Sequence, residues 1–514
     1  MASAQTFIYE THEQLISELV INDRPLQDVC NDIAKIYLSD NRPWLIGFSG
    51  GKDSTAVLSL IYSALLSISP EKRHKHIYVV SSDTLVETPV VVDLIGDVLG
   101  TINKQAKIDN ISMTAHPVFP KMDQTFWVNL LGKGYPAPQQ SFRWCTERMK
   151  IDPVSDFIKD KVAKHGEVIV ALGSRSQESA SRAQTIASHN IEGSPLSRHS
   201  SLPNAYTYMP IVDWSADDVW EYLISAPCPY GGDNWKLFDL YKGSNQGECP
   251  LVIDTNTPSC GNSRFGCWTC TVVTEDKALH GLIESGDEWM RPLLDFRNEL
   301  HRSTKPENKS EYRNFKRRTG KVTYMREVKD DDKKTSDAAP EVKKHVPGPY
   351  WMKQRQDWVR HLLETEKSMN DQGHDISLIK FEELKEIRQQ WLTDPNEPDW
   401  MDTLPKIYAD VYGDTAEWVE NDLGTFTNED VELLRELSAQ HGLSPELVMK
   451  LVETEIEVTG LGKRRGVIAK LETLLSRDWE SLEEIKARHS AEAVNPWKDK
   501  LNELSEAYER ASAL

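Results

Sequence analysis

The run Ile46–Ser54, IGFSGGKDS, constrains this chain more than any other segment. An apolar strand signal at 44–46 leads into it, and an apolar helix pattern at 55–66 follows it. A glycine-rich turn before a helix presents unpaired backbone N–H groups at the positive end of the helix dipole, which suits a pyrophosphate group. The common P-loop has Ser or Thr after its Lys, whereas Asp53 follows Lys52 here. The alternative is an ordinary strand-to-helix turn, but Lys and Asp inside a glycine turn serve no packing purpose.

Short apolar strand signals alternate with helix patterns in the N-terminal half of the chain. The strand signals lie at 45–48, 76–80, 168–172 and 208–211, and the helix patterns between them lie at 55–66 and 90–99. This alternation predicts an α/β fold with a parallel sheet flanked by helices. Ligands of such sheets bind at the carboxyl ends of the strands, where the glycine turn lies. Residues 184–205 are rich in Ser, His, Asn and Pro and predict a loop.

The chain of 514 residues is long for one core, so we expect several domains. The predicted segments are an N-terminal helical segment (1–42), the α/β domain (43–227), a cysteine-rich segment with a basic stretch (228–328), a charged linker (329–349) and an acidic, mainly helical C-terminal domain (350–514). Residues 351–514 hold 20 Lys and Arg against 35 Asp and Glu, so they carry most of the formal charge of −20. This balance argues against a stand-alone nucleic-acid binder.

The sequence shows no membrane signal. It has no run of about 18 apolar residues, and its N-terminus lacks a basic region followed by an apolar one. We therefore expect a cytoplasmic protein without a membrane partner.

The seven cysteines favour metal ligation over disulfides. Their number is odd, and the chain is long and has no signal peptide. Cys267 and Cys270 form a Cys-x-x-Cys pair with Cys260 upstream, and Cys145 lies far back in FRWCTERMK. Four thiolates hold either Zn²⁺ or an iron–sulfur cluster, and the ligand count does not separate these. The other three cysteines, Cys30, Cys228 and Cys249, are either sulfur carriers or buried small apolar residues, the commoner case.

Several motifs carry a resemblance to a known family. The run at 46–54 resembles the PP-loop of the ATP pyrophosphatases, which cleave ATP between its α and β phosphates. The segment at 126–153 and the run Gly173–Ser179, GSRSQES, with Arg182, resemble signatures of the PAPS reductase-like family, and so does PIVDW at 210–214. Within that family the chain is most similar to the DndC-type sulfurtransferases of bacterial DNA phosphorothioation. The motifs are specific up to residue 270 and weak beyond about residue 350.

The resemblance implies a function and a set of site residues. ATP would bind on an adenine-nucleotide alpha-hydrolase-like sheet. The implied catalytic residues are Lys52 at the β and γ phosphates, Asp53 on Mg²⁺ and Arg175 at the α phosphate or ribose. The implied ATP-binding set is Ser49, Gly50, Gly51, Lys52, Asp53, Ser54, Asp83, Glu87, Gly173 and Arg175. A 4Fe–4S cluster would be held by Cys145, Cys260, Cys267 and Cys270. The implied partners are a cysteine desulfurase as sulfur donor, other DNA phosphorothioation proteins, and DNA.

Other functions compete with this interpretation. A sulfonucleotide reductase resembles the chain through the α/β domain, but it attacks with a cysteine near its C-terminus, and here the last cysteine is Cys270. A tRNA thiolase would need an RNA-binding appendage, which we do not find, and a non-catalytic scaffold would not need the intact Lys52-Asp53-Ser54 set. The basic stretch 313–329 holds seven Lys and Arg against one acidic residue, and it is either a DNA contact or a solvated charged segment.

Overall fold

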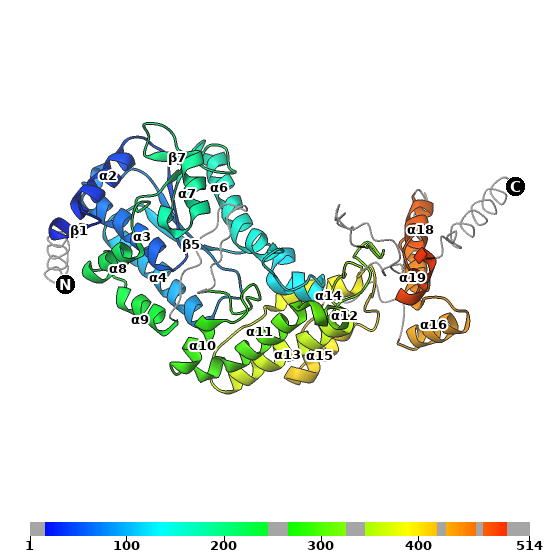
Figure 1. Ribbon diagram of the computed structural model, residues 1–514. Helices are drawn as coiled ribbons and strands as arrows, with labels where there is room; N and C mark the ends of the chain where they lie inside the picture. The colour runs from blue at the N-terminus through cyan, green and yellow to red at the C-terminus, as the bar shows by residue number, and fades with distance from the viewer. Residues whose placement is uncertain (1–15, 245–265, 325–344, 419–427, 459–465, 491–514) are drawn as a thin grey trace, which may run out of the picture. The chain divides into compact units, whose positions relative to one another are not determined.

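The computed structural model describes residues 16–244, 266–324, 345–418, 428–458 and 466–490 (Figure 1). The chain divides into two compact units. The first unit takes residues 1–126, 138–301 and 369–378, and the second takes residues 127–137, 302–368 and 379–514. The domain boundaries that the sequence suggested stay a prediction. None of the helices in the described ranges combines the length and the apolar character that crossing a membrane requires.

The first unit is built on a six-stranded sheet, which confirms the predicted α/β fold class. The strand order is β5-β4-β3-β6-β8-β7, and all neighbours are parallel except β7 and β8. The strands are β3 (Trp44–Gly47), β4 (Ile77–Ser82), β5 (Met113–Val118), β6 (Val168–Ala171), β7 (Leu196–Arg198) and β8 (Ala205–Tyr208). The central strands β3 and β6 are buried at every position, as expected for parallel strands covered on both faces.

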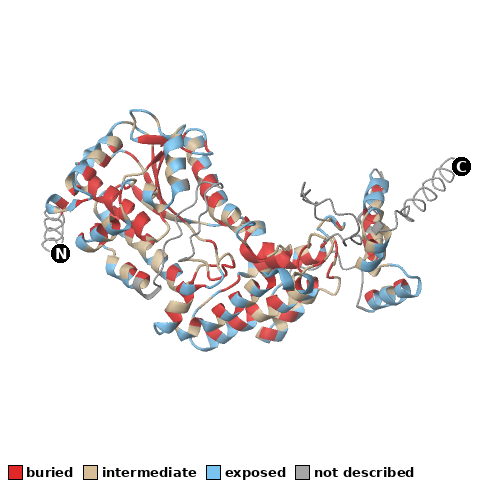
Figure 2. Ribbon diagram, viewed as in Figure 1, coloured by how far each residue is buried: buried red, intermediate tan, exposed pale blue. Residues whose placement is uncertain are grey.

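Helices cover both faces of this sheet (Figure 1). One core cluster joins strand residues such as Ile46 to α2, α3, α4 and α8, and a second joins the alternate strand residues, such as Leu45, to α6. These helices are α2 (Leu26–Leu38), α3 (Lys52–Leu66), α4 (Pro89–Ile108), α6 (Asp152–His165) and α8 (Ala216–Ser225). Helix α3 is buried from Lys52 to Leu65, so it is a central helix without a solvent face (Figure 2).

The remaining described elements are mostly helical. In the first unit they include α5 (Trp144–Thr146), α7 (Ala180–His189), α9 (Asn234–Ser244) and α10 (Lys277–Glu284). Helix α11 (Arg291–Thr304) begins in the first unit, and its last residues belong to the second. Beyond it lie α12 (Lys309–Tyr312), α13 (Met352–Asp371), α14 (Phe381–Leu392), α15 (Thr403–Tyr412), α16 (Asn428–Gln440), α17 (Pro445–Val458), α18 (Val467–Leu475) and α19 (Leu482–Ser490). The helical C-terminal region expected from the sequence is confirmed.

Three local expectations were wrong. The segment expected to be helical up to residue 42 contains a small hairpin of β1 (Val20–Ile21) and β2 (Arg24–Pro25), because Asn22 and Asp23 both adopt positive φ between them. The sequence pattern missed β5, an edge strand that contains Pro117. The expected loop at 184–205 includes the end of α7 and all of β7.

Candidate active site

The glycine turn and the Arg175 segment follow the carboxyl ends of two adjacent strands. β3 pairs with β4 on one side and with β6 on the other, so the chain moves outward through β4 and β5 before it returns to β6. The strand order therefore reverses between β3 and β6. In an open parallel sheet, the loops that leave such a switch point border the usual ligand crevice.

The glycine turn is shaped by its own hydrogen bonds. Gly50 has a φ of 75°, a conformation that favours glycine, and a Cβ there would come within 2.8 Å of the Ile95 side chain. The hydroxyl of Ser54 donates to the carbonyl of Gly51 at 2.9 Å and accepts from the backbone N–H of Ser49 at 3.2 Å. Helix α3 then begins at Lys52, so the N-terminal end of its dipole faces this turn.

Gly173 allows a close backbone approach between the two loops. A Cβ at this position would lie 2.7 Å from the carbonyl carbon of Asp53 and 2.9 Å from the backbone nitrogen of Ser54. Both are backbone atoms of the first turn of α3. The sequence resemblance implied that Gly173 belongs to the ATP-binding set, and the structure shows that it lets the loop after β6 approach α3 closely.

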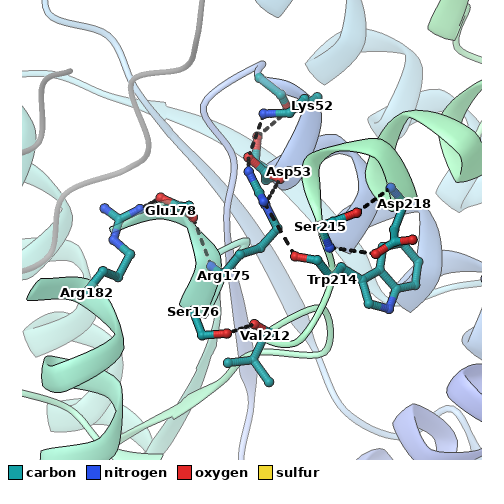
Figure 3. Close-up of polar contacts among 12 residues, drawn as sticks. Lys52, Asp53, Arg175, Ser176, Glu178, Arg182, Val212, Trp214, Ser215 and Asp218 are labelled. Atoms are coloured by element: carbon teal, nitrogen blue, oxygen red, sulfur yellow. Dashed lines mark hydrogen bonds and ion pairs between the residues drawn. The ribbon is translucent and has the colours of Figure 1, made fainter. Parts of the chain in front are cut away.

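Asp53 brings two cations together at the start of α3 (Figure 3). Its Oδ1 accepts from Nε of Arg175 at 2.5 Å, and its Oδ2 accepts from Nη2 of Arg175 at 3.5 Å and from Nζ of Lys52 at 3.2 Å. The three side chains are only 5% to 8% exposed. The structure therefore joins the three residues that the sequence predicted to be catalytic into one buried group.

The loop after β6 holds Arg175 from several sides. The backbone N–H of Arg175 donates to Oε1 of Glu178 at 2.9 Å, and Glu178 is also paired with Arg182. Nη1 of Arg175 lies 3.5 Å from the carbonyl oxygen of Trp214 (Figure 3). The guanidinium thus has Asp53 as a partner on one side and the carbonyl of Trp214 on the other.

Burial governs the charge of Lys52. Loss of water lowers the pKa of its ammonium group, Asp53 raises it in part, and the positive charge of Arg175 lowers it again. Asp53 therefore helps to keep Lys52 protonated. Because both oxygens of Asp53 already face these cations, its surroundings give no support to the predicted role as a Mg²⁺ ligand, and we derive no step through that ion.

Asp83 and Glu87 lie in the loop that follows β4. Oδ1 of Asp83 accepts from the backbone N–H of Leu85, which has a positive φ of 64°, so Asp83 shapes the turn. Oε1 of Glu87 accepts from the hydroxyl of Thr84 at 2.8 Å and lies 3.9 Å from Nζ of Lys150. Their predicted role in ATP binding stays a prediction.

The Cys-x-x-Cys pair lies against this same loop. Residues Glu87 and Cys267 pair as a short antiparallel bridge, the backbone N–H of Thr88 donates to the carbonyl of Gly266 at 2.6 Å, and that of Trp268 donates to Val86. The Cys267 thiol lies 3.7 Å from Oε1 of Glu87. The structure thus places this cysteine pair at the carboxyl end of β4, the strand next to β3.

A buried arginine holds the chain that follows the cysteine pair. Arg297, on α11, is 0% exposed, and its Nε donates to the carbonyl of Cys270 at 2.8 Å. Its two other nitrogens donate to the carbonyls of Thr274, at 2.9 Å, and Val273. Sequence reasoning missed Arg297. The spacing of Leu293, Arg297 and Leu300 places all three on one helix face, and this pattern could have predicted that the arginine is buried.

The predicted cluster ligands are only partly described. Cys267 and Cys270 are joined by a turn in which the N–H of Cys270 donates to the carbonyl of Cys267, and this spacing suits two ligands of one metal group. Cys145 lies in α5, whereas Cys260 and Cys249 lie outside the described residues. Within the described ranges, no group of three or more His, Cys, Asp and Glu is arranged to hold a metal ion.

Cys30 and Cys228 have the surroundings of inert thiols. Burial raises the pKa of the Cys30 thiol to about 12 and that of the Cys228 thiol to about 11. A thiol that stays protonated at neutral pH is a poor nucleophile. Of the two interpretations left open by the sequence, these pKa values favour the buried apolar role for both residues.

In the described part of the basic stretch, several side chains form contacts within their own unit. The guanidinium of Arg313 donates to the carbonyls of Gly348 and Pro347, both at 2.7 Å, and Arg318 donates to the carbonyl of Lys133. Nζ of Lys316 lies 5.5 Å from the ring centroid of Trp479. These contacts give no support to the predicted DNA contact, which stays a prediction. They also differ from the alternative interpretation, because the side chains of a solvated charged segment would face water.

Backbone and aromatic groups of the site were also missed. The carbonyl of Trp214 accepts from Arg175, and the hydroxyl of Tyr241 accepts from the backbone N–H of Lys52 at 3.4 Å. Trp214 belongs to a motif that the sequence identified, but a carbonyl contact leaves no side-chain signal. Tyr241, far along the chain, had no signal.

Comparison with known proteins identifies the domain that holds this site. Residues 43–273 match the phosphoadenosine phosphosulfate reductase domain model. The chain is 27% identical to the uncharacterized protein MJ0066 of Methanocaldococcus jannaschii over 237 residues, which are 45% of this chain and 43% of that protein. It is 28% identical to MJ0973 of the same organism over 195 residues, 37% of this chain and 39% of that protein. The chain thus spans less than half the length of these relatives.

Solved structures align with the chain only loosely. The phosphoadenylyl-sulfate reductase of Candida auris covers 46% of this chain and 91% of its own, with 14% identity and a TM-score of 0.26. The U34-tRNA thiolase NcsA of Methanococcus maripaludis, solved with its [4Fe-4S] cluster, covers 42% and 72%, with 14% identity and a TM-score of 0.26. These scores are too low to carry an argument about function. Residues 43–273 are thus similar to the phosphoadenosine phosphosulfate reductase domain, and the finer resemblance to DndC-type proteins stays a prediction.

Proposed function

We propose that this chain is an ATP-dependent sulfurtransferase that takes part in replacing a non-bridging oxygen of a DNA backbone phosphate with sulfur. The observation that carries the ATP part is the buried group of Lys52, Asp53 and Arg175 beside the glycine turn at the switch point of the sheet. The choice of DNA rests on the sequence resemblance.

The site supplies the groups that cleavage of ATP between its α and β phosphates requires. The N-terminal end of α3 and the ammonium of Lys52 would bind the phosphates that leave as pyrophosphate, and Arg175 would stabilise charge at the α phosphate. A non-bridging oxygen of the acceptor would attack the α phosphorus, and pyrophosphate would leave. Sulfur at the oxidation level of sulfide would then attack the acceptor phosphorus, and AMP would leave with the original oxygen.

The cysteine pair gives sulfur chemistry a place near that site. Cys267 pairs with Glu87 in the loop leaving β4, and Cys270 follows three residues later; β4 lies directly beside the strand that carries the glycine turn. With Cys145 and Cys260 these two cysteines would hold the proposed 4Fe–4S cluster. A cysteine desulfurase would be the source of the sulfur, and other DNA phosphorothioation proteins would bring the DNA.

Sulfonucleotide reduction is the second candidate, because the matching domain model is that of phosphoadenosine phosphosulfate reductase. It predicts sulfite release from a sulfonucleotide by the purified protein when a dithiol is supplied as the two-electron reductant. It does not require pyrophosphate release from ATP, so the two assays separate the candidates.

The test compares Lys52→Gln with Lys104→Gln, a matched change at an exposed lysine on α4. We expect Lys52→Gln to lower pyrophosphate release by about 10²-fold or more, because it removes a charge that stabilises the transition state. Cells that carry the Lys52→Gln protein with its partners should contain no phosphorothioate-linked dinucleotides after nuclease digestion and mass spectrometry, whereas the Lys104→Gln cells should contain them. Sulfur lost from tRNA bases instead would support a tRNA thiolase.

A further inference from the structure

We propose that Asp53 is a built-in counter-ion that occupies the phosphate-binding cations until a nucleotide polyphosphate displaces it. The inference rests on the proposed ATP site and assigns Asp53 a positioning role in place of metal ligation. Asp53 would hold Lys52 and Arg175 in place in the empty site and compete with phosphate for them in the filled one.

The first argument is the shape of the contact. The two oxygens of Asp53 face Nε and Nη2 of Arg175, so the carboxylate meets the guanidinium side-on with both oxygens (Figure 3). Carboxylate and phosphate both offer a pair of oxygens that fits this fork of donors. A phosphate oxygen pair that binds Arg175 in this way must therefore replace Asp53.

The second argument is position. Asp53 lies in the first turn of α3, where the helix dipole favours a negative charge. This is also the place where a glycine turn presents its N–H groups to a phosphate. The carboxylate and a bound phosphate would thus share the same source of positive potential as well as the same two side chains.

The third argument is the balance of buried charge. Lys52 and Arg175 contribute two positive charges, and Asp53 contributes one negative charge, all on side chains that are at most 8% exposed. Glu178 does not neutralise the guanidinium of Arg175, because its described contacts are with the backbone N–H of that residue and with Arg182. A phosphate that replaced Asp53 would therefore meet two positive charges in a poorly solvated place.

The proposal predicts that removing the charge of Asp53 tightens nucleotide binding. In Asp53→Asn the competing charge is gone, so α,β-methylene ATP should bind about tenfold more tightly in EDTA. Asp53→Ser, which also removes the charge, should tighten binding as well and serves if the Asn protein does not fold.

Isothermal titration of the full chain with α,β-methylene ATP, in EDTA and in Mg²⁺, measures the effect. Asp97→Asn, a change at an exposed acid on α4, should leave affinity as in the wild type. The double variant Asp53→Asn with Arg175→Gln should lose the tighter binding. If Asp53→Asn weakens binding in Mg²⁺ and leaves it unchanged in EDTA, Asp53 is a metal ligand and the proposal is wrong.

The same experiment separates this inference from the proposed function. A wild-type protein that neither binds the analogue nor cleaves ATP refutes both. A wild-type protein that cleaves ATP, together with an Asp53→Asn variant whose affinity in EDTA matches it, refutes only the counter-ion role.

Discussion

Gly173→Ala is the sharpest test of how the two loops of the site are held together. The added methyl carbon would lie 2.7 Å from the carbonyl carbon of Asp53, 2.8 Å from its carbonyl oxygen and 2.9 Å from the backbone nitrogen of Ser54. Carbon atoms in good contact are about 3.5–4.0 Å apart, so the overlap is about 0.8 Å or more. All three neighbours are backbone atoms of α3, which cannot rotate away as a side chain can.

The expected result is a modest loss of stability and a large loss of activity. Overpacking of this kind costs about 1–3 kcal/mol. A shift of about 1 Å in the first turn of α3 relative to Arg175 should lower the rate of pyrophosphate release by about 10²-fold. The stability change is measured by urea unfolding and the rate by single-turnover ATP cleavage.

Gly96→Ala is the matched control. Gly96 is exposed within α4, and a Cβ there would meet nothing within 4 Å. This change should stabilise the protein by about 0.4–1 kcal/mol, because alanine restricts the unfolded chain more than glycine does, and it should leave the rate unchanged. If Gly173→Ala unfolds and cleaves ATP like the wild type, the close approach does not constrain the site and the reasoning fails.

Two further predictions concern the cysteines and the second unit. We expect iron and sulfide in anaerobically purified wild-type protein; Cys270→Ser should lack both and Cys30→Ser should keep them, and stoichiometric zinc without iron would contradict the cluster. Asp394→Asn should lower the free energy of unfolding by about 3–5 kcal/mol, because Asp394 is 3% exposed and pairs with the buried Arg355 at 3.0 Å. Burial alone would raise the pKa of Asp394, but Arg355 and two backbone N–H groups outweigh it and lower the pKa. The stabilisation by Asp394 is therefore complete above the unfolded-state pKa of about 3.9 and is lost as the pH falls through the lower folded-state pKa. The free energy of unfolding in urea should consequently depend less on pH in the Asn variant than in the wild type over that range.

The parts of the site that depend on near neighbours in the chain could be predicted. The glycine turn, its Lys and its Asp are recognisable because covalent continuity fixes their spacing between a strand and a helix. Even there, the predicted start of the helix was wrong. The sequence pattern predicted a start at Thr55, because Lys52, Asp53 and Ser54 resemble turn residues, whereas the helix begins at Lys52. The first turn of the helix is therefore part of the proposed phosphate-binding surface.

Contacts between distant segments could not be predicted. Cys267 meets Glu87 through a backbone bridge, and nothing in either segment specifies which residue of the other it opposes. The basic stretch shows the same limit, because sequence reveals the charge of Arg313 but not the carbonyls of Gly348 and Pro347 that accept its hydrogen bonds. Backbone carbonyls are present at every position, so they leave no mark in a residue pattern.

The spacing of Gly173 and Arg175 is a consequence of the switch point. The loop that leaves β6 passes the first turn of α3 at Gly173, where the two backbones approach too closely for a side chain. Arg175 then reaches back to the carboxylate of Asp53, on the residue whose backbone Gly173 touches. One short loop therefore contacts Asp53 through its main chain and through its side chain. Both contacts depend on how β6 is positioned relative to β3. A change that moves the backbone at Gly173 therefore also moves Arg175 away from the position where it pairs with Asp53, or with the proposed phosphate.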